Sequence, residues 1–231
     1  MSGRRQANSN SESVDNYLKA ILSLGGPEHR RVTSTSLADH LGVAPASVTN
    51  MLQKLAGSTT PLVEYERHRG VLLSPAGKRR ALEVLRHHRL IETFLYEVLN
   101  YPIEEVHEEA ERLEHFISER FEERIAAKLG HPRIDPHGHS IPTMDGEMTE
   151  RNSILLTEVE QEGSFVIDSV SDRDAHTLRQ LKASGIKPGA KLRVRKSASI
   201  EGYSVSLGRS AKAFELSREA AGDIRLLPHA K

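Results

Sequence analysis

The chain contains no cysteine among its 231 residues. Disulfides, zinc–thiolate clusters and a cysteine nucleophile are therefore excluded, and any bound metal must be held by imidazole, carboxylate or backbone oxygen. The sequence also begins without the apolar core of a secretion signal, and no later apolar run approaches the roughly 20 residues of a membrane span. We therefore expect a soluble, cytoplasmic protein that has no membrane partner.

Charge is unevenly distributed along the chain, although the formal net charge is zero. Lys and Arg number 11 against 6 Asp and Glu in residues 1–80, 8 against 18 in residues 81–160, and 13 against 8 in residues 161–231. The three blocks therefore carry +5, −10 and +5, and 7 of the 12 histidines lie between His87 and His139. A basic first segment suits a polyanion such as DNA, whereas an acidic, histidine-rich middle suits cations.

The first third of the sequence has the pattern of a helix-turn-helix domain. We expect residues 1–13 to be disordered, because they are small and polar, and an amphipathic stripe beginning at Val14 predicts the first helix. Two short helices follow within residues 34–56, separated by a turn at Gly42. Two short apolar runs then predict a β-hairpin, the wing that grips phosphate in proteins of this kind.

The second short helix presents small polar residues near its start and a lysine near its end, which suits insertion into a DNA major groove. The tip of the hairpin is cationic. Helix pairs with glycine turns are common in proteins that do not bind DNA, but the helix pair, the hairpin and the positive charge agree with one another and favour DNA binding. The candidate DNA-contacting residues are Thr35, Ala46, Ser47, Thr49, Asn50, Gln53, Lys54, Arg67 and Arg69.

Six nitrogen and oxygen donors stand at helical spacings in the acidic middle of the chain. These are His88, Glu92, His107, Glu111, Glu114 and His115. If residues 103–129 form one helix, the last four donors project within an arc of roughly 100°. The first two are an i, i+4 pair on the preceding helix, expected over 75–100. Such a donor set on two helices predicts a divalent-metal site.

The alternative is a solvated helix face stabilised by pairs such as Glu108 with Arg112. We expect that environment for Glu104, Glu105, Glu108, Glu119, Glu122 and Glu123. His87 faces away from His88 on a helix and should be solvated. The loop histidines His137 and His139 could contact a metal, but most histidines in loops are solvated, and that is the environment we expect for them.

The last part of the chain changes character. Residues 141–155 read as a linker, and from residue 156 to 231 short alternating runs punctuated by glycine predict several strands around one short helix at 174–184. Many short strands in so few residues argue for a small barrel.

Taken together, these parts resemble the diphtheria-toxin-repressor family of metal-dependent transcriptional regulators. The segment VHEEAERLEH preceded by HRLIE carries the resemblance most strongly, and the run from APASVTNMLQKL to LSPAGKRR is similar to the manganese-responsive branch. The resemblance implies a mainly α fold. It would consist of a winged helix-turn-helix domain over 14–80, a helical metal-binding and dimerisation domain over 81–140, and a small SH3-like β-barrel of the FeoA type over 156–231.

The same resemblance divides the donors into two metal sites per subunit. The primary site corresponds to Glu111, Glu114 and His115 with Asn16 from the first helix, and the ancillary site to His88, Glu92 and His107 with Asp174 from the barrel. Asn16 stands where the family usually has methionine or aspartate, Glu111 where iron-responsive members often have cysteine, and Thr177 where a glutamine is often found. A site without sulfur is harder and favours Mn²⁺, with Fe²⁺ as the second candidate.

The function implied is a homodimeric repressor of metal-homeostasis genes, activated by metal to bind a palindromic operator in double-stranded DNA. Residues 101–129 would supply the dimer contact, and no organic cofactor or enzymatic activity is expected. Two alternatives stay open. One is a winged-helix regulator that ignores metal; the other is a metalloenzyme, although the Glu-x-x-His pattern occurs once, at Glu104 to His107, where a di-metal bundle needs a pair.

Overall fold

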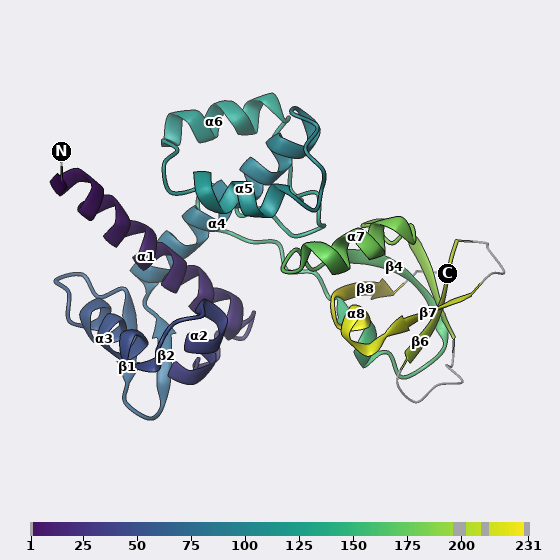
Figure 1. Cartoon of the computed structure of the whole chain (residues 1–231), viewed down its shortest axis with the longest axis horizontal. Helices are drawn as coiled ribbons and strands as arrows, with labels where there is room; N and C mark the ends of the chain where they lie inside the picture. Colours follow the sequence, from purple (N-terminus) through teal and green to yellow (C-terminus); the bar gives the residue numbers. More distant parts are fainter. Residues whose placement is uncertain (1, 196–201, 209–212, 229–231) are drawn as a thin grey trace. The chain divides into compact units, whose positions relative to one another are not determined.

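The structure, a computed structural model, describes residues 2–195, 202–208 and 213–228 (Figure 1). Two compact units divide the chain: residues 1–88, 113–119 and 142–148 form the first, and residues 89–112, 120–141 and 149–231 the second. In the described residues no helix is long and apolar enough to cross a membrane.

The first helix is longer than the sequence pattern predicted. Helix α1 spans Ser2–Gly25, so it begins before the amphipathic stripe that starts at Val14. Extending a helix costs far less than nucleating one, and no proline interrupts the segment before Gly25. The amphipathic face that begins at Val14 supplies the buried anchor for this extension.

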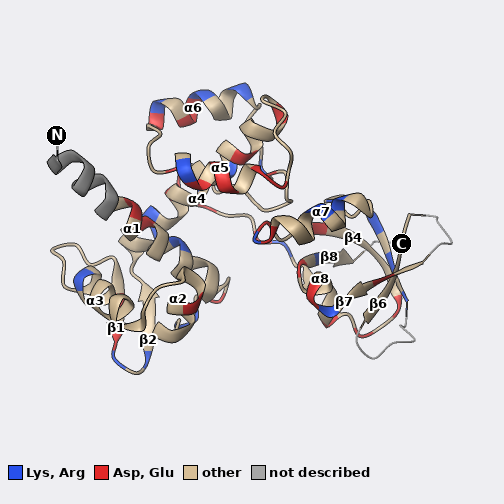
Figure 2. Cartoon of the chain, in the orientation of Figure 1, with Lys and Arg blue, Asp and Glu red and all other residues tan. Residues whose placement is uncertain are grey.

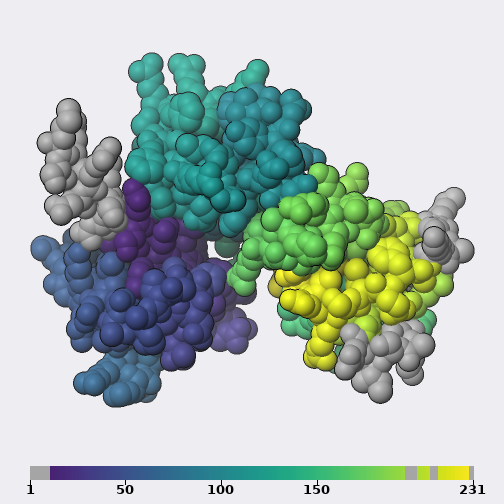
Figure 3. Space-filling model, in the orientation of Figure 1, coloured from purple at the N-terminus to yellow at the C-terminus, as the bar shows by residue number. Residues whose placement is uncertain are grey.

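The winged helix-turn-helix is present with the elements expected. Helix α2 (Ser34–Leu41) and helix α3 (Pro45–Ala56) are followed by strands β1 (Val63–Glu66) and β2 (Gly70–Leu73), which pair antiparallel. Thr33 caps α2 by accepting a hydrogen bond from the amide of Ser36, and Gly42 takes a left-handed φ of 63° in the turn. Helices α2 and α3 and the hairpin form one compact region (Figure 3).

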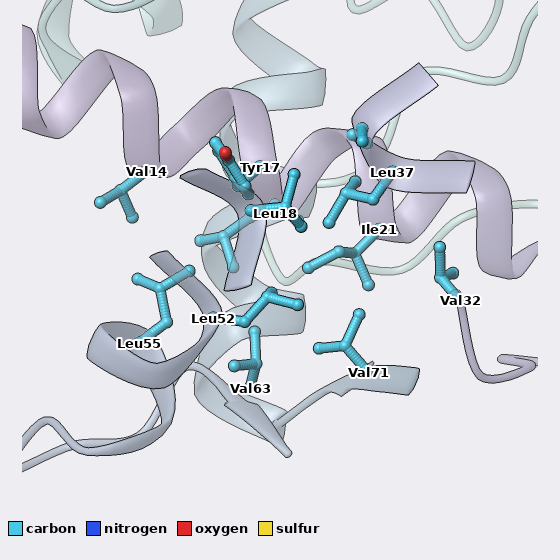
Figure 4. Close-up of a cluster of buried hydrophobic side chains, with 14 residues drawn as sticks. Val14, Tyr17, Leu18, Ile21, Val32, Leu37, Leu52, Leu55, Val63 and Val71 are labelled. Atoms are coloured by element: carbon cyan, nitrogen blue, oxygen red, sulfur yellow. The ribbon is translucent and has the colours of Figure 1, made fainter. Parts of the chain in front are cut away.

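The core of this unit joins α1 to the two short helices and the hairpin (Figure 4). Its fully buried members include Leu18, Leu37, Val48, Leu52 and Val71, each 0% exposed. Burying a side chain of this size stabilises the fold by about 1.5–3 kcal/mol. The apolar face of α1 therefore holds α2 and α3 in place.

The helical region after the wing departs from the prediction at one place. Helix α4 spans Pro75–Glu97 as expected, but the single helix predicted over 103–129 is two helices, α5 (Val106–Leu113) and α6 (Glu119–Lys128). Glu114 and His115 lie in the turn between them. The carbonyl oxygen of Glu114 accepts a hydrogen bond at 3.2 Å from the ring of His87, which belongs to α4.

The break changes which face of α6 is buried. Ile125 and Ala126 pack with Leu90 and Ile141, and Glu122 is buried with 3% exposure. Phe121, on the same helix, is 51% exposed. The expectation that Glu122 is solvated was therefore wrong, because the phase of α6 is independent of α5.

The C-terminal part of the second unit is an antiparallel sheet with the strand order β3-β8-β4-β5-β6-β7. The strands are β3 (Ile154–Leu155), β4 (Gly163–Val170), β5 (Lys191–Arg195), β6 (Gly202–Leu207), β7 (Phe214–Ser217) and β8 (Ile224–Pro228). Helix α7 (Ala175–Ala183), the short helix α8 (Arg218–Gly222) and a 3-10 turn at Leu156–Glu158 complete it. The predicted strands are present, but among the described residues β3 does not pair with β7, so the sheet is open where a closed SH3-like barrel was expected.

Candidate metal centre and DNA-binding surface

A first group of polar side chains gathers around the carboxylate of Glu114 in the first unit. We call it the primary cluster and define it as Asn16, Lys19, His88, Glu114 and His115. Glu114 has 0% side-chain exposure. Its Oε2 lies 2.6 Å from Nδ1 of His88, and its Oε1 lies 3.3 Å from Nε2 of His115. A buried carboxylate here is matched by imidazoles from α4 and from the α5–α6 turn.

Asn16 joins the primary cluster from α1. Its Oδ1 lies 3.0 Å from Nε2 of His115, so the predicted proximity of these two residues is present. On the other side of the same ring, Nδ1 of His115 is 3.4 Å from Oδ2 of Asp15, whose Oδ1 accepts from Arg80 at 2.6 Å. Burial raises the pKa of Asp15, but His115 and Arg80 outweigh it and hold that pKa below its ordinary value.

His87 positions the turn that carries two of these residues. The expectation that His87 is solvated was wrong, since it is 6% exposed. Its Nδ1–H donates to the carbonyl oxygen of Glu114, and its Nε2 lies 3.7 Å from Oε1 of Glu119. The expected ligand Glu111 lies half-buried in the last turn of α5.

A second group of donors lies wholly within the second unit. We call it the second cluster and define it as Glu92, His107, Asp135, His137, His139 and Asp172. Ligand atoms of Glu92, His107 and Asp172 lie within 4.8 Å of one another, as do those of Asp135, His137 and His139. Nδ1 of His107 is 3.3 Å from Oε1 of Glu92 and 3.6 Å from Oδ2 of Asp172. His88 precedes Glu92 by one turn of α4.

The loop histidines belong to this cluster, contrary to expectation. Oδ1 of Asp135 accepts the backbone amides of His137 and His139, each at 2.9 Å, and this turn directs both rings inward. His137 is fully buried. Its Nε2–H donates to the carbonyl oxygen of Ile103 at 3.2 Å, which leaves Nδ1 facing Oε2 of Glu92 at 3.7 Å. Fixing one ring nitrogen on a carbonyl is how proteins orient a histidine ligand.

The carboxylates of the second cluster stabilise positive charge. Burial lowers the pKa of His137, but Glu92, Asp172 and Asp135 raise it more strongly, to about 9. Burial also raises the pKa of Asp172, yet the imidazoles of His139, His107 and His137 bring it below its ordinary value. A proton is therefore held where three carboxylates converge.

These distances fit a small divalent ion. Two ligand atoms roughly 2.2 Å from one ion stand about 3.1 Å apart at a right angle and about 3.6 Å apart at the tetrahedral angle. The separations of 3.3, 3.6 and 3.7 Å among Glu92, His107, Asp172 and His137 are close to that range. Nδ1 of His137 and Oδ2 of Asp135 are buried without a hydrogen-bond partner among the described residues. Buried polar atoms normally have a hydrogen-bond partner or bind an ion, so these two atoms favour a bound ion.

Asp174 is not brought to this cluster. Its carboxylate caps α7, accepting from the amides of His176 at 3.2 Å and Thr177 at 2.8 Å and from the Thr177 hydroxyl. Asp172, two residues earlier, lies beside His107 instead. Of these two carboxylates, Asp172 therefore lies in the second cluster and Asp174 lies at the start of α7.

The candidate DNA-contacting residues lie on the open surface of the winged helix. Eight of them are solvent-exposed: Thr35, Ala46, Ser47, Asn50, Gln53, Lys54, Arg67 and Arg69. Thr49 is half-buried, and its hydroxyl donates to the carbonyl oxygen of Pro45 at 3.2 Å. Glu66 pairs with Arg31 at 2.6 Å and with Arg69 at 3.0 Å, so the wing tip, with its basic residues in blue in Figure 2, is held by a local ion-pair network.

Sequence reasoning missed Asp172, Asp135, His137, His139 and Lys19. The spacing Asp-x-His-x-His was a usable signal, because alternate residues of a turn can face one point. Lys19 gave no such signal, since its partner is 95 residues away.

Three protein-family models match successive parts of the chain. The iron dependent repressor N-terminal DNA binding domain matches residues 10–71, the iron dependent repressor metal binding and dimerisation domain matches 74–143, and the FeoA domain matches 154–227.

Relatives and solved structures agree with those matches. The chain is 30% identical over 198 residues to the iron-dependent repressor IdeR of Mycobacterium tuberculosis, covering 79% of this chain and 84% of IdeR. It is 33% identical over 114 residues to the regulator MntR of Listeria monocytogenes, covering 49% and 77%. A manganese-dependent transcriptional repressor in complex with manganese is similar with a TM-score of 0.84 and 34% identity over 93% of this chain and 99% of that one. ScaR with bound Zn²⁺ gives 0.80 and 30% over 94% and 99%.

Proposed function

Since this chain belongs to the family of metal-dependent transcriptional repressors that includes IdeR, the diphtheria toxin repressor and MntR, we propose that it represses transcription by binding a palindromic operator as a homodimer when Mn²⁺ is available. Fe²⁺ is the second candidate ion. The chain is a DNA-binding regulator and not an enzyme.

The observation that carries the metal dependence is the second cluster. It gathers only nitrogen and oxygen donors, three of them buried and three half-buried, at separations that suit one ion. Mn²⁺ and Fe²⁺ accept such ligands, whereas a sulfur-free site has no special preference for softer ions. A divalent cation would supply the positive charge that lets these carboxylates and imidazoles share one small volume.

The residues that would hold the ion divide into two sites per subunit. Within the second unit, Glu92, His107, His137, His139 and Asp172 would form one. Within the first unit, Asn16, His88, Glu114 and His115 would form the other. The primary cluster includes a residue of α1, so ligand binding there bears on the position of the first helix of the DNA-binding domain.

The mechanism is a change in population and not in chemistry. Asn16 and His115 orient α1, and α1 packs through Leu18 and Ile21 against the core that holds α2 and α3. A state in which these contacts are closed presents both recognition helices of a dimer at a fixed separation, which two major-groove half-sites require. Metal activates only if it binds that state more tightly than the open one.

The metalloenzyme alternative loses its one motif. Glu104, the first residue of the single Glu-x-x-His pattern, points to Lys182 at 3.1 Å and Arg179 at 3.8 Å, and a backbone hydrogen bond together with those two cations lowers its pKa. Its role is to pair with α7.

The test is operator binding measured against free metal. DNA selected from a random pool in the presence of Mn²⁺ would be titrated with wild type and with Glu92→Ala by fluorescence anisotropy, with Mn²⁺, Fe²⁺, Zn²⁺ or chelator. We expect tight binding only with metal, and weak binding of Glu92→Ala at every metal concentration. Equal affinity of the wild type with Mn²⁺ and with chelator would overturn the proposal.

A further inference from the structure

Lys19 places a cation inside the primary cluster. This residue of α1 directs its Nζ between the two oxygens of Glu114, at 2.7 Å from Oε1 and 2.8 Å from Oε2. The Glu114 side chain is 0% exposed and that of Lys19 is 15% exposed. A lysine is rarely buried unless its charge is matched, and here one carboxylate matches it with both oxygens.

The Lys19 ammonium contacts the same carboxylate oxygens of Glu114 that would bind a metal ion. A metal ion ligated by Glu114 needs at least one of the two oxygens that Nζ now contacts. An ion there and an ammonium less than 3 Å from the same oxygens would repel each other in a buried setting, where charge is weakly screened. The ion and the Lys19 ammonium therefore compete for the same carboxylate.

The two clusters also differ in net formal charge. The contacts around Glu114 join two carboxylates, Asp15 and Glu114, to two cations, Lys19 and Arg80, so −2 and +2 give zero. In the second cluster, Glu92, Asp135 and Asp172 contribute −3, and Arg89 at 3.6 Å from Asp135 contributes +1, which leaves −2. When an ion replaces the proton on His137, the histidines are neutral, and the second cluster then has more uncompensated negative charge than the ion pairs of Asp15 and Glu114.

We propose that Lys19 is a built-in counter-cation that competes with metal for Glu114 and sets the metal concentration at which the primary cluster fills. This inference rests on the function proposed above. In the metal-free protein the Lys19–Glu114 pair already ties α1 to the α5–α6 turn. As the ion binds Glu114, the flexible lysine stem swings toward solvent. The second cluster fills first, and the primary cluster fills at a higher metal concentration.

The first experiment counts and ranks bound ions. Mn²⁺ binding to full-length wild type, Lys19→Gln and Lys19→Met would be followed by electron paramagnetic resonance of free Mn²⁺. Wild type should show one tight and one weaker ion per chain, and both variants should tighten the weaker ion by about tenfold or more, the effect of removing one competing charge. Lys19→Arg keeps the charge and should stay weak. Lys78→Gln, which removes a half-buried charge beside His29 in the same unit, should match wild type.

The Mn²⁺ titration distinguishes the role of Lys19 from metal binding itself. Two ions bound with unchanged affinities in Lys19→Gln and Lys19→Met would overturn the role of Lys19 and leave metal dependence intact. No bound ion in the wild type would overturn the proposed function itself. The wild type alone gives a second test, since acetylation of Lys19 followed by mass spectrometry should accelerate as the weaker ion binds. A rate that does not change with Mn²⁺ would contradict the displacement of Lys19.

Discussion

At the scale of single residues, hydrogen bonds separate the candidate metal ligands from the residues that cap helices. Asp172 and Asp174 are two positions apart, yet the first faces His107 and the second caps α7. Both are carboxylates in an acidic, histidine-bearing context, and only their hydrogen bonds distinguish them. A carboxylate that accepts two backbone amides and a hydroxyl has little left to offer a metal.

Substitution should separate these two roles. Asp172→Ala should weaken Mn²⁺ binding to the second cluster by about 10- to 100-fold, whereas Asp174→Ala should leave that affinity unchanged and lower thermal stability by removing the α7 cap. Calorimetric titration and circular-dichroism melting of both variants make the comparison. A drop in Mn²⁺ affinity in Asp174→Ala alone would restore Asp174 as the ligand.

The cap also predicts a pH dependence. The Thr177 hydroxyl and the amides of Thr177 and His176 hold the pKa of Asp174 below its ordinary value of 3.8. A lowered pKa in the folded state contributes stability that is complete above the unfolded value and is lost as the pH falls through the folded value. The melting temperatures of wild type and Asp174→Ala should therefore differ at about pH 7 and converge well below pH 3.8, measured with chelator present. A difference that persists in strong acid would show that the charge of Asp174 is not what stabilises α7.

At the scale of elements, the local sequence pattern predicted most helices and strands, whereas contacts between residues far apart in the sequence determine where some of them end. The winged helix, α4, α7 and the terminal strands follow from periodicity and glycine turns. The break between α5 and α6 does not, because the atoms that hold Glu114 come from Lys19, His87 and His88, between 26 and 95 residues away. Periodicity is equally silent about the turn at Asp135, whose hydrogen bonds to two backbone amides aim two loop histidines inward.

The wing depends on one glycine. Gly70 has a φ of +94°, and a Cβ there would lie 2.5 Å from the carbonyl oxygen of Val32, which accepts the amide of Val71 at 2.9 Å. Gly70→Ala should destabilise the DNA-binding domain by roughly 1–3 kcal/mol in urea unfolding, the usual cost of a strained backbone. Gly26→Ala is the matched control, since its φ is +63° and nothing lies within 4 Å of its Cβ position. Equal destabilisation would mean that φ strain alone, and not the clash with Val32, sets the cost.

The exposed arginine at the wing tip predicts a salt effect. Arg69 is bound on one side by Glu66 and is otherwise open to a phosphate. Arg69→Ala should weaken operator and nonspecific DNA binding about equally, and the slope of log affinity against log salt should become shallower by about 0.9 for each phosphate that the variant no longer neutralises. Asn50→Ala, on the exposed face of α3, should reduce operator affinity and leave the salt slope unchanged. An unchanged slope in Arg69→Ala would remove the wing from the DNA interface.

At the scale of the whole molecule, the palindromic operator proposed here would require two chains, and the exposed apolar side chains of residues 101–129 are the candidates for their contact. Phe121 is 51% exposed although a phenylalanine gains about 1.5–3 kcal/mol from burial. Phe121→Glu would place a charge in that contact, so the variant should sediment as a monomer at concentrations where wild type is a dimer. Its affinity for a two-half-site operator should fall much further than its affinity for a single half-site, because only the first depends on linked recognition helices. Met144→Glu, 67% exposed and outside this range, should remain dimeric. A dimeric Phe121→Glu would place the subunit contact elsewhere on the chain.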